Sequence, residues 1–243
     1  MTKNILVTGC AGFIGFNLAK TLINQNFNVI GIDSLNNAYD TKFKELRLNN
    51  LNSDSNFKFF NKDLSIVESL NQIEDIDIVY HMGARAGVRA SFEDPISYIK
   101  DNTIATTNVA NFCKNNDVSK MILASTSSIY GNSGDKEMVE DVDEKINPPS
   151  IYASTKLSGE TLAKTILSEH DTNLIITIKS ISLILEEKKM TIQAVTTWEG
   201  TPKALEILVE GAKQSGPIHE SMGAKNPRLW RASSGGDMSQ AYY

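Results

Sequence analysis

The chain has 243 residues, of which 41% are hydrophobic and 22% charged, and its formal net charge is −5. This composition is typical of an ordinary globular protein, and the acidic balance lacks the basic excess of a general nucleic-acid binder. The two cysteines and three histidines are scattered, so the sequence predicts neither a disulfide framework nor a metal site. No apolar run approaches the roughly 18 residues of a membrane span, and no signal-peptide core follows the N-terminus. We expect a cytoplasmic protein without a membrane or nucleic-acid partner.

Six short apolar runs alternate with helix-length segments along residues 1–178. The runs are bounded by turn residues or charges, as buried parallel strands are, and the segments between them show helical periodicity. The expected strands are 5–7, 28–32, 57–60, 76–80, 120–124 and 173–178, and the expected helices are 13–23, 64–73, 96–113 and 155–167. Because right-handed crossovers place helices on both faces of a parallel sheet, this order predicts an α/β, Rossmann-type doubly wound fold. Ligands of such a fold bind beyond the carboxyl ends of the strands.

The chain changes character after residue 178. A charge run at 186–189 predicts a loop or solvated face, and 202–214 predicts one amphipathic helix. The remainder, 215–243, is rich in Gly, Ser and Pro and is expected to be poorly ordered. Asparagine is frequent up to Asn173 and occurs only once afterwards, at Asn226. We therefore divide the chain into one domain, 1–178, and an atypical, truncated C-terminal region, 179–243.

A glycine-rich segment joins the first expected strand to the first expected helix. It reads Thr-Gly-Cys-Ala-Gly-Phe-Ile-Gly from Thr8. In a dinucleotide-binding loop the first glycine permits a tight turn, the second lets the backbone approach a pyrophosphate, and the third lets the helix pack closely. Glycines alone also suit a plain turn, but the strand-loop-helix context favours dinucleotide binding, with backbone N–H groups facing the anion. The residues expected at this position are Gly9, Gly12, Phe13, Ile14 and Gly15.

Acidic residues close the second and third expected strands. Asp33 lies eighteen residues after Gly15, where a carboxylate accepts hydrogen bonds from the ribose hydroxyls of NAD and repels the 2′-phosphate of NADP. Asp63 and Leu64 are placed to flank the adenine, although Asp63 also suits a helix N-cap. The sequence therefore predicts that 1–178 is an NAD-binding domain.

Two groups of polar side chains lie near the expected ends of later elements. Tyr152 and Lys156 are four residues apart and so share one helix face. The reference pKa of tyrosine, about 10, is too high for a general base near neutrality, but a lysine cation and a bound nicotinamide both lower it. The hydroxyl run Ser125–Ser128 ends the fifth strand, where it is suited to hold a substrate hydroxyl or simply to cap the next turn.

Taken together, the glycine loop, Asp33, the Ser-Thr-Ser-Ser-Ile-Tyr-Gly run and the Tyr152/Lys156 pair resemble the extended short-chain dehydrogenase/reductase family of NAD-dependent epimerases and dehydratases. Two further segments, Leu-Asn-Asn-Ala-Tyr-Asp from Leu35 and His-Met-Gly-Ala-Arg-Ala-Gly-Val-Arg from His81, are similar to the UDP-glucuronate 4-epimerases within it. The likeness covers about residues 1–178, three-quarters of the chain.

The resemblance implies a catalytic set of Thr126, Tyr152 and Lys156. Thr126 would hold the sugar's 4-hydroxyl, Tyr152 would take its proton, and NAD⁺ would accept the C4 hydride and later return it to the other face of a 4-keto sugar. Besides the residues named above, the resemblance places Asn102, Ser125, Tyr152 and Lys156 near the cofactor. It places Gly87, Arg89, Thr126, Ser127, Ser128 and Tyr152 near the substrate, a UDP-hexuronate or UDP-hexose.

The residues after Thr126 favour epimerisation within this family. Related dehydratases carry an Asp-Glu pair there, because loss of water needs an added acid and base, and related decarboxylases carry a Glu at the second position. Here both positions, Ser127 and Ser128, are serine. Family members also pair through the helices that correspond to 96–113 and 152–167, so the resemblance implies a homodimer.

The resemblance ends near Ile178. The family continues as Arg-x-Phe-x-Val-Tyr-Gly-Pro, whereas this chain reads Ile-Lys-Ser-Ile-Ser-Leu from Ile178. We hypothesise a reading-frame slip or fusion there, which a family-like segment in another downstream frame would support and its absence would contradict. Three other interpretations stay open: a catalytically impaired dinucleotide-binding remnant, another nucleotide-sugar epimerase or dehydratase, or a short-chain reductase acting on a free carbonyl.

Overall fold

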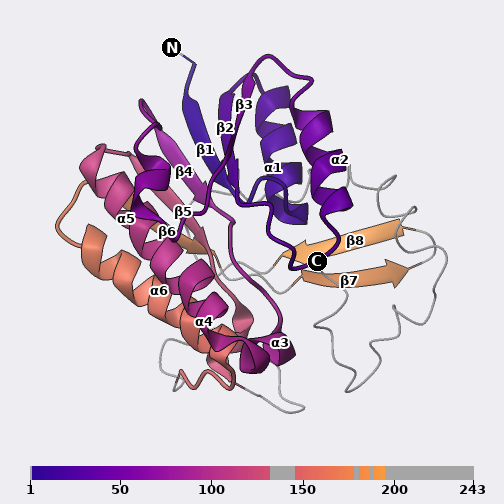
Figure 1. Ribbon diagram of the computed structural model, residues 1–243, viewed down its shortest axis with the longest axis vertical. Coiled ribbons are helices and arrows are strands. Elements are labelled where there is room, and N and C mark those ends of the chain that lie inside the picture. Colours follow the sequence, from indigo (N-terminus) through magenta and orange to yellow (C-terminus); the bar gives the residue numbers. More distant parts are fainter. Residues whose placement is uncertain (1, 132–145, 178–180, 187–188, 195–243) are drawn as a thin grey trace.

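Six parallel strands form the central sheet of the protein (Figure 1). The computed structural model describes residues 2–131 and 146–177, together with the backbone of 181–186 and 189–194. The strand order is β3-β2-β1-β4-β5-β6, and it reverses between β1 and β4. This is the Rossmann order, with a switch point at which ligands bind, so the predicted fold class is confirmed. The strands are β1 (Asn4–Thr8), β2 (Asn28–Asp33), β3 (Phe57–Asn61), β4 (Ile78–His81), β5 (Lys120–Ala124) and β6 (Asn173–Thr177).

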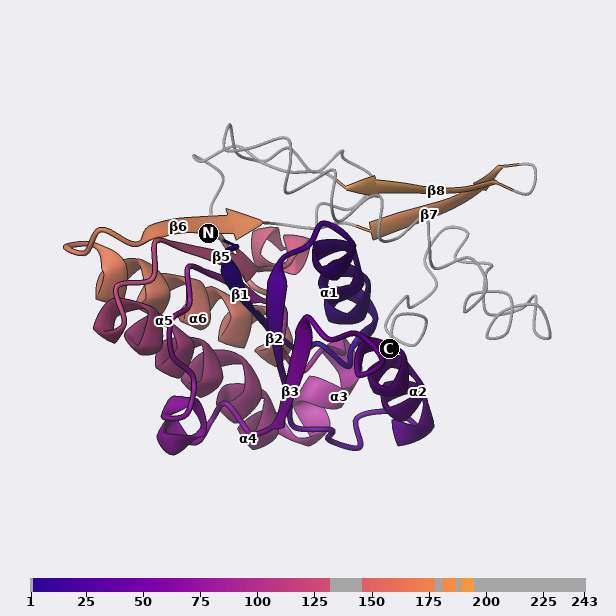
Figure 2. The same ribbon diagram turned by 90° about the horizontal axis from the view of Figure 1, so that it is seen from above.

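Helices cover both faces of the sheet (Figure 2). Helices α1 (Phe13–Asn24) and α2 (Thr41–Leu51) lie on one face, and α5 (Ala105–Asn115) and α6 (Ile151–Leu167) lie on the other. Successive side chains of β1 point to opposite faces of the sheet. Ile5 and Val7 pack in the apolar cluster that contains α1 (the α1 cluster), and Leu6 packs in the cluster that contains α5 (the α5 cluster). The sheet is therefore buried on both sides, as its apolar strands predict.

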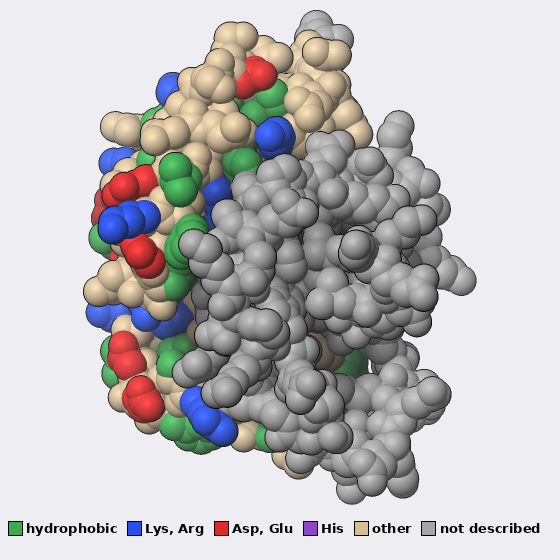
Figure 3. Space-filling model, turned by 90° about the vertical axis from the view of Figure 1, so that its right-hand side faces the viewer, with side chains coloured by type: hydrophobic (Ala, Val, Ile, Leu, Met, Phe, Trp, Pro, Cys, Tyr) green, Lys and Arg blue, Asp and Glu red, His purple; other side chains and the backbone are tan. Residues whose placement is uncertain are grey.

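Charged side chains of both signs are interspersed on the described part of the face shown in Figure 3. Within the described part of the chain, no helix is both long and apolar enough to span a bilayer.

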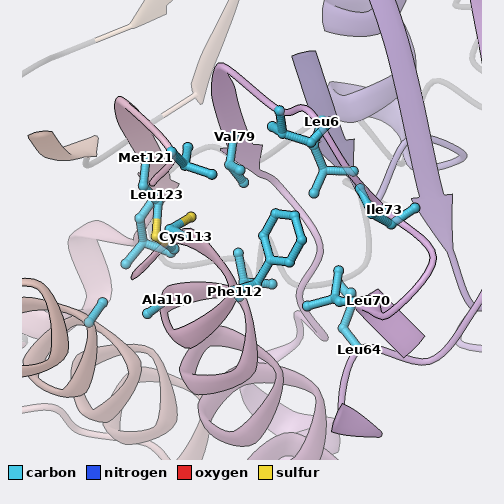
Figure 4. Close-up of a cluster of buried hydrophobic side chains, with 14 of the residues drawn as sticks. Leu6, Leu64, Leu70, Ile73, Val79, Ala110, Phe112, Cys113, Met121 and Leu123 are labelled. Atoms are coloured by element: carbon cyan, nitrogen blue, oxygen red, sulfur yellow. The ribbon is translucent and has the colours of Figure 1, made fainter. Parts of the chain in front are cut away.

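The predicted helix 64–73 is wrong. The segment contains only a 3₁₀ turn, Val67–Leu70. Hydrogen bonds to Asp63 hold the segment instead: its Oδ1 accepts from Ser65 N–H at 2.9 Å and its carbonyl from the Ser69 hydroxyl at 2.5 Å. Such local bonds compete with a helical ladder. The spaced apolar side chains that suggested a helix, Leu64, Leu70 and Ile73, are nevertheless buried against α5 (Figure 4).

The predicted helix 96–113 is helical throughout but not uniform. It comprises α4 (Pro95–Tyr98), a π-helix (Ile99–Ile104) and α5, and a short helix α3 (Val88–Glu93) precedes it. π-Helical turns are rare and frequently mark functional sites. Helix α6 begins at Ile151, earlier than predicted, because the Ser150 hydroxyl caps it by accepting from Ala153 N–H at 3.1 Å.

Beyond residue 178 the structure describes a β-hairpin that the sequence did not predict. Strands β7 (Ile181–Glu186) and β8 (Lys189–Ala194) form a separate antiparallel sheet in which Glu186 is paired with Lys189. The predicted helix 202–214 and the segment 215–243 lie outside the described residues. The domain boundary at 178 stays a prediction.

Candidate active site

The glycine loop after β1 approaches the neighbouring backbone closely. Gly9 has a φ of +67°, and its N–H donates to the Ile32 carbonyl at 2.7 Å. A Cβ on Gly9 would lie 2.7 Å from the Gly83 backbone, and one on Gly15 would overlap the Gly9 carbonyl. The first glycine therefore makes the predicted tight turn, and the third lets α1 start directly against the loop. No side chain caps α1 at its N-cap, Gly12, so the N–H groups of its first turn have no side-chain acceptor there.

Asp33 ends β2 beside this loop and is already hydrogen-bonded by the protein. Its Oδ1 accepts from Leu35 N–H at 2.8 Å and from Lys44 Nζ at 3.4 Å, and its Oδ2 accepts from Ala11 N–H at 3.2 Å. Lys44 also donates to Asn36 Oδ1 at 2.9 Å. These bonds fix the Asp33 carboxylate at the wall of the cavity described below, and its hydrogen bonds to the ribose hydroxyls of NAD stay a prediction.

Helix α2 supplies two buried cations that sequence reasoning missed. Lys44 is 5% exposed and Arg47 is 3% exposed. Arg47 Nη1 donates to the Ala11 carbonyl at 3.1 Å and to the Tyr39 hydroxyl at 2.9 Å, while its Nη2 is buried without a partner among the described residues. The signal for this helix was Asp40, whose carboxylate caps it by accepting from Lys42 N–H.

One cavity brings together part of the predicted cofactor set. Its lining includes Gly9, Gly12, Asp33, Asp63 and Leu64 from the prediction, and also Asn36, Tyr39, Lys44, Lys62 and Arg85. The other predicted cofactor residues, Phe13, Ile14, Gly15, Asn102, Ser125, Tyr152 and Lys156, do not line it.

Asn102 acts as a structural link rather than as part of the cavity wall. It is fully buried in the π-helix. Its Oδ1 accepts from Arg85 N–H at 2.7 Å, and its Nδ2 donates to the Arg85 carbonyl at 2.9 Å and to Thr155 Oγ1 at 3.1 Å. The side chain thereby fixes the loop after β4 to α6. Arg85 itself is paired with Asp101 at 2.7 Å and is not a solvated surface residue.

The three predicted catalytic residues lie together at the carboxyl end of β5. Burial raises the pKa of Tyr152, and the Thr126 side chain, which lies within reach of the phenol, opposes that shift. Lys156 Nζ donates to the Ala124 carbonyl at 2.6 Å. Burial lowers the pKa of Lys156 to about 8, and the charge of Glu160 counteracts this. At neutral pH the Lys156 side chain is therefore an ammonium, and it lies one helical turn after the Tyr152 phenol.

The predicted substrate residues lie on two short elements near this group. Ser127 and Ser128 are half-buried in the turn Ser127–Tyr130, where Thr126 Oγ1 lies 3.2 Å from Ser128 Oγ. Gly87 is buried with a φ of 112° and precedes α3, which carries the exposed Arg89 and packs against α6. Their contacts with a sugar nucleotide stay predictions.

His81 ends β4 inside this network and serves no titrating role. Its Nδ1 is 2.7 Å from Thr8 Oγ1 and its Nε2 is 3.0 Å from Thr106 Oγ1. Burial, together with the charge of Lys156, lowers its pKa to about 3, so the ring is neutral at physiological pH. The described residues contain no cluster of three or more His, Cys, Asp or Glu side chains that could hold a metal ion.

Comparison with known proteins finds relatives that match about two thirds of the chain. An uncharacterised protein of Methanocaldococcus jannaschii is 44% identical over 168 residues, which cover 66% of this chain and 51% of that protein. A UDP-glucuronate 4-epimerase of Thermodesulfobacterium geofontis is 43% identical over 164 residues, covering 66% and 50%. The crystal structure of UDP-glucuronic acid 4-epimerase from Bacillus cereus, in complex with UDP-glucuronic acid and NAD, matches with a TM-score of 0.64 and 36% identity, covering 71% and 55%.

The chain spans about half the length of the curated relatives it matches. The model of the NAD-dependent epimerase/dehydratase family matches residues 5–180, well over half of the chain. This range coincides with the one over which the sequence motifs resemble that family, so the resemblance is confirmed. The chain belongs to the NAD-dependent epimerase/dehydratase family.

Proposed function

We propose that the protein is an NAD-dependent nucleotide-sugar 4-epimerase that interconverts UDP-glucuronate and UDP-galacturonate. The observation that carries this proposal is the position of Tyr152 at the carboxyl end of β5, within reach of Thr126 and one helical turn before Lys156, whose Nζ donates to the Ala124 carbonyl. Relatives of 43% and 36% identity are named as epimerases of this sugar nucleotide.

The residues of the chain fit the dinucleotide. The uncapped start of α1 and the close turn at Gly9 would face the pyrophosphate, and Asp33 with Lys44 and Asn36 would hold the adenine ribose. Asp63 and Leu64 line the same cavity, where the adenine would lie. When bound, NAD⁺ supplies a hydride acceptor for the sugar's C4 and returns that hydride in the second half of the cycle.

The side chains of the chain handle the proton. Thr126 would orient the sugar's 4-hydroxyl, and the Tyr152 phenolate would take its proton while C4 becomes a carbonyl. Tyr152 would then return the proton to the same oxygen when C4 is reduced again. Lys156 favours the phenolate through its positive charge. In the turn after Thr126, Ser127 and Ser128 supply hydroxyls at the positions where elimination of water would need a carboxylic acid.

The proposal is tested by incubating the purified full chain with UDP-glucuronate and following the sugar by NMR. We expect UDP-galacturonate to accumulate without a net change in the absorbance of the reduced cofactor. Bound NAD without product would instead identify a catalytically impaired remnant. Net oxidation of NADH by a free carbonyl compound would identify a reductase.

Asp33 is expected to set the choice of cofactor. The change Asp33→Ala removes a charged acceptor of ribose hydroxyls and should weaken NAD binding about 10- to 100-fold, while NADP binding weakens less. Isothermal titration of both cofactors measures this. The matched control is Asp54→Ala, since Asp54 precedes β3 at the opposite end of the sheet. An unchanged ratio of NAD to NADP affinity in Asp33→Ala would contradict the assignment.

An exposed apolar surface is expected to form a homodimer. Six large apolar side chains on α3, α4, the π-helix and α6 are exposed: Val88 (36%), Phe92 (58%), Ile96 (61%), Ile99 (42%), Ile104 (39%) and Leu162 (39%). Light scattering should give the mass of two chains, and Ile96→Glu should shift it to one. The control Leu46→Glu alters an equally exposed side chain on α2, across the sheet, and should leave the dimer intact. A dimer that survives Ile96→Glu would contradict this interface.

A further inference from the structure

A buried carboxylate lies one helical turn beyond the catalytic lysine. Glu160 is 4% exposed, and its Oε1 accepts a hydrogen bond from the Ser125 hydroxyl. Its Oε2 lies 3.8 Å from Nζ of Lys164, whose side chain is largely exposed. A buried carboxylate is costly unless it is paired, so its position behind the active site needs a reason.

Lys156 supplies that reason, because a buried lysine tends to lose its proton. Lys156 is 5% exposed, and the Ala124 carbonyl is an uncharged acceptor. Without a compensating anion, the pKa of a buried ammonium falls by several units. Lys156 and Glu160 are four residues apart on α6, and helical side chains lean toward the N-terminus, so Glu160 leans over the turn that carries Lys156.

The other titratable groups around Lys156 do not supply this negative charge. Tyr152 precedes it on α6 and has a pKa raised by burial. His81, from β4 across the core, is neutral because its pKa is about 3. The strand end that Lys156 contacts contributes a carbonyl and the hydroxyls of Ser125 and Thr126. Among the described residues, Glu160 is the carboxylate whose charge favours the Lys156 ammonium.

We propose that Glu160 is a positioning residue of the active site: its buried carboxylate keeps Lys156 in the ammonium form and, through Ser125, ties the end of β5 to α6. Ser125 directly precedes Thr126, and its N–H donates to the Thr177 carbonyl at 2.8 Å. The Glu160 carboxylate thus holds the end of β5, from which Thr126 projects. It also maintains the positive charge of Lys156, which acts on Tyr152. Its catalytic consequence rests on the proposed epimerase activity, but the ionisation of Lys156 does not require a substrate.

The experiment is a titration of Lys156 by NMR in the full chain labelled with [¹³Cε]lysine, the signal being assigned with Lys156→Met. Glu160→Gln keeps an oxygen for Ser125 and removes only the charge, so the apparent pKa of Lys156 should fall by about one unit or more. Glu160→Asp retains the charge at a greater distance and should give an intermediate value. Glu169→Gln removes the same charge from an exposed site just after α6 and should coincide with the unmodified chain.

These variants separate the inference from the proposed function. A Lys156 titration that is the same in Glu160→Gln and the unmodified chain would overturn the inference, whether or not the protein epimerises a sugar. If Glu160→Gln does not fold, the comparison of Glu160→Asp with the unmodified chain decides in the same way. In the epimerisation assay, the alkaline limb of the kcat profile should move to lower pH in Glu160→Gln and be largely restored in Glu160→Asp. An equal loss of rate at every pH in Glu160→Gln would indicate that the Glu160 carboxylate is only structural. It would contradict its role in keeping Lys156 protonated.

Discussion

The change Tyr152→Phe is expected to lower kcat for UDP-glucuronate epimerisation by about 10³-fold, because the phenol is the group that exchanges a proton with the sugar's 4-hydroxyl. The Thr126 hydroxyl keeps its contact with Ser128 Oγ, 3.2 Å away, and the ring still fills its place against Tyr98, whose centroid lies 6.4 Å away in an edge-on contact. NAD affinity and thermal stability should therefore change little. Conversion measured by NMR at saturating substrate gives kcat directly.

The matched control for this prediction is Tyr80→Phe. Tyr80 is buried, 6% exposed, and it packs in the α1 cluster on the other face of the sheet from α6. Its loss of a hydroxyl should leave kcat within about twofold, as expected for a residue outside the reacting group. A kcat in Tyr152→Phe equal to that of Tyr80→Phe would show that another group transfers the proton.

The epimerisation rate is expected to fall as the pH rises through about 8, the pKa to which burial lowers Lys156. Below that pH the side chain is an ammonium and favours the Tyr152 phenolate; above it the side chain is neutral and the phenol is harder to ionise. Lys156→Met should lower kcat by about 10²-fold or more near neutrality and abolish this alkaline limb. Profiles of kcat against pH for the two proteins measure both effects.

Lys114→Met provides the control for this profile. It removes an ammonium from an exposed site in the last turn of α5 and should leave the alkaline limb in place. An alkaline limb that persists unchanged in Lys156→Met would assign it to a different group.

Much of the fold follows from features that act locally along the chain. Apolar runs that end in turn residues marked all six strands of the central sheet, and the glycines at 9 and 15 marked the turn that only a residue without Cβ can make. The segment after Asp63 misled the prediction, because apolar spacing there serves burial against α5 while Ser65 and Ser69 hydrogen-bond to Asp63. Periodicity reports which side chains are buried, not which backbone bonds hold them.

The least predictable parts of the site are its buried charges. A sequence pattern assigns charged residues such as Lys44, Arg47 and Glu160 to solvent. In the structure each is buried and hydrogen-bonded to a residue elsewhere in the chain: Lys44 to Asp33, Arg47 to Ala11 and Glu160 to Ser125. Helix α2 was missed for the same reason, since two cations occupy its inward face. By contrast, Thr126, Tyr152 and Lys156 were found because the family motif names them, and the structure places them at one strand end.

The most direct test of the account uses UDP-glucuronate that carries deuterium at C4, incubated with the full chain and its NAD in ordinary water. In the proposed cycle the hydride leaves C4, stays within the site and returns to C4, while only the oxygen-bound proton passes through Tyr152. We therefore predict UDP-galacturonate that retains deuterium at C4. A product with protium at that carbon, or no product from chains that hold NAD, would contradict it.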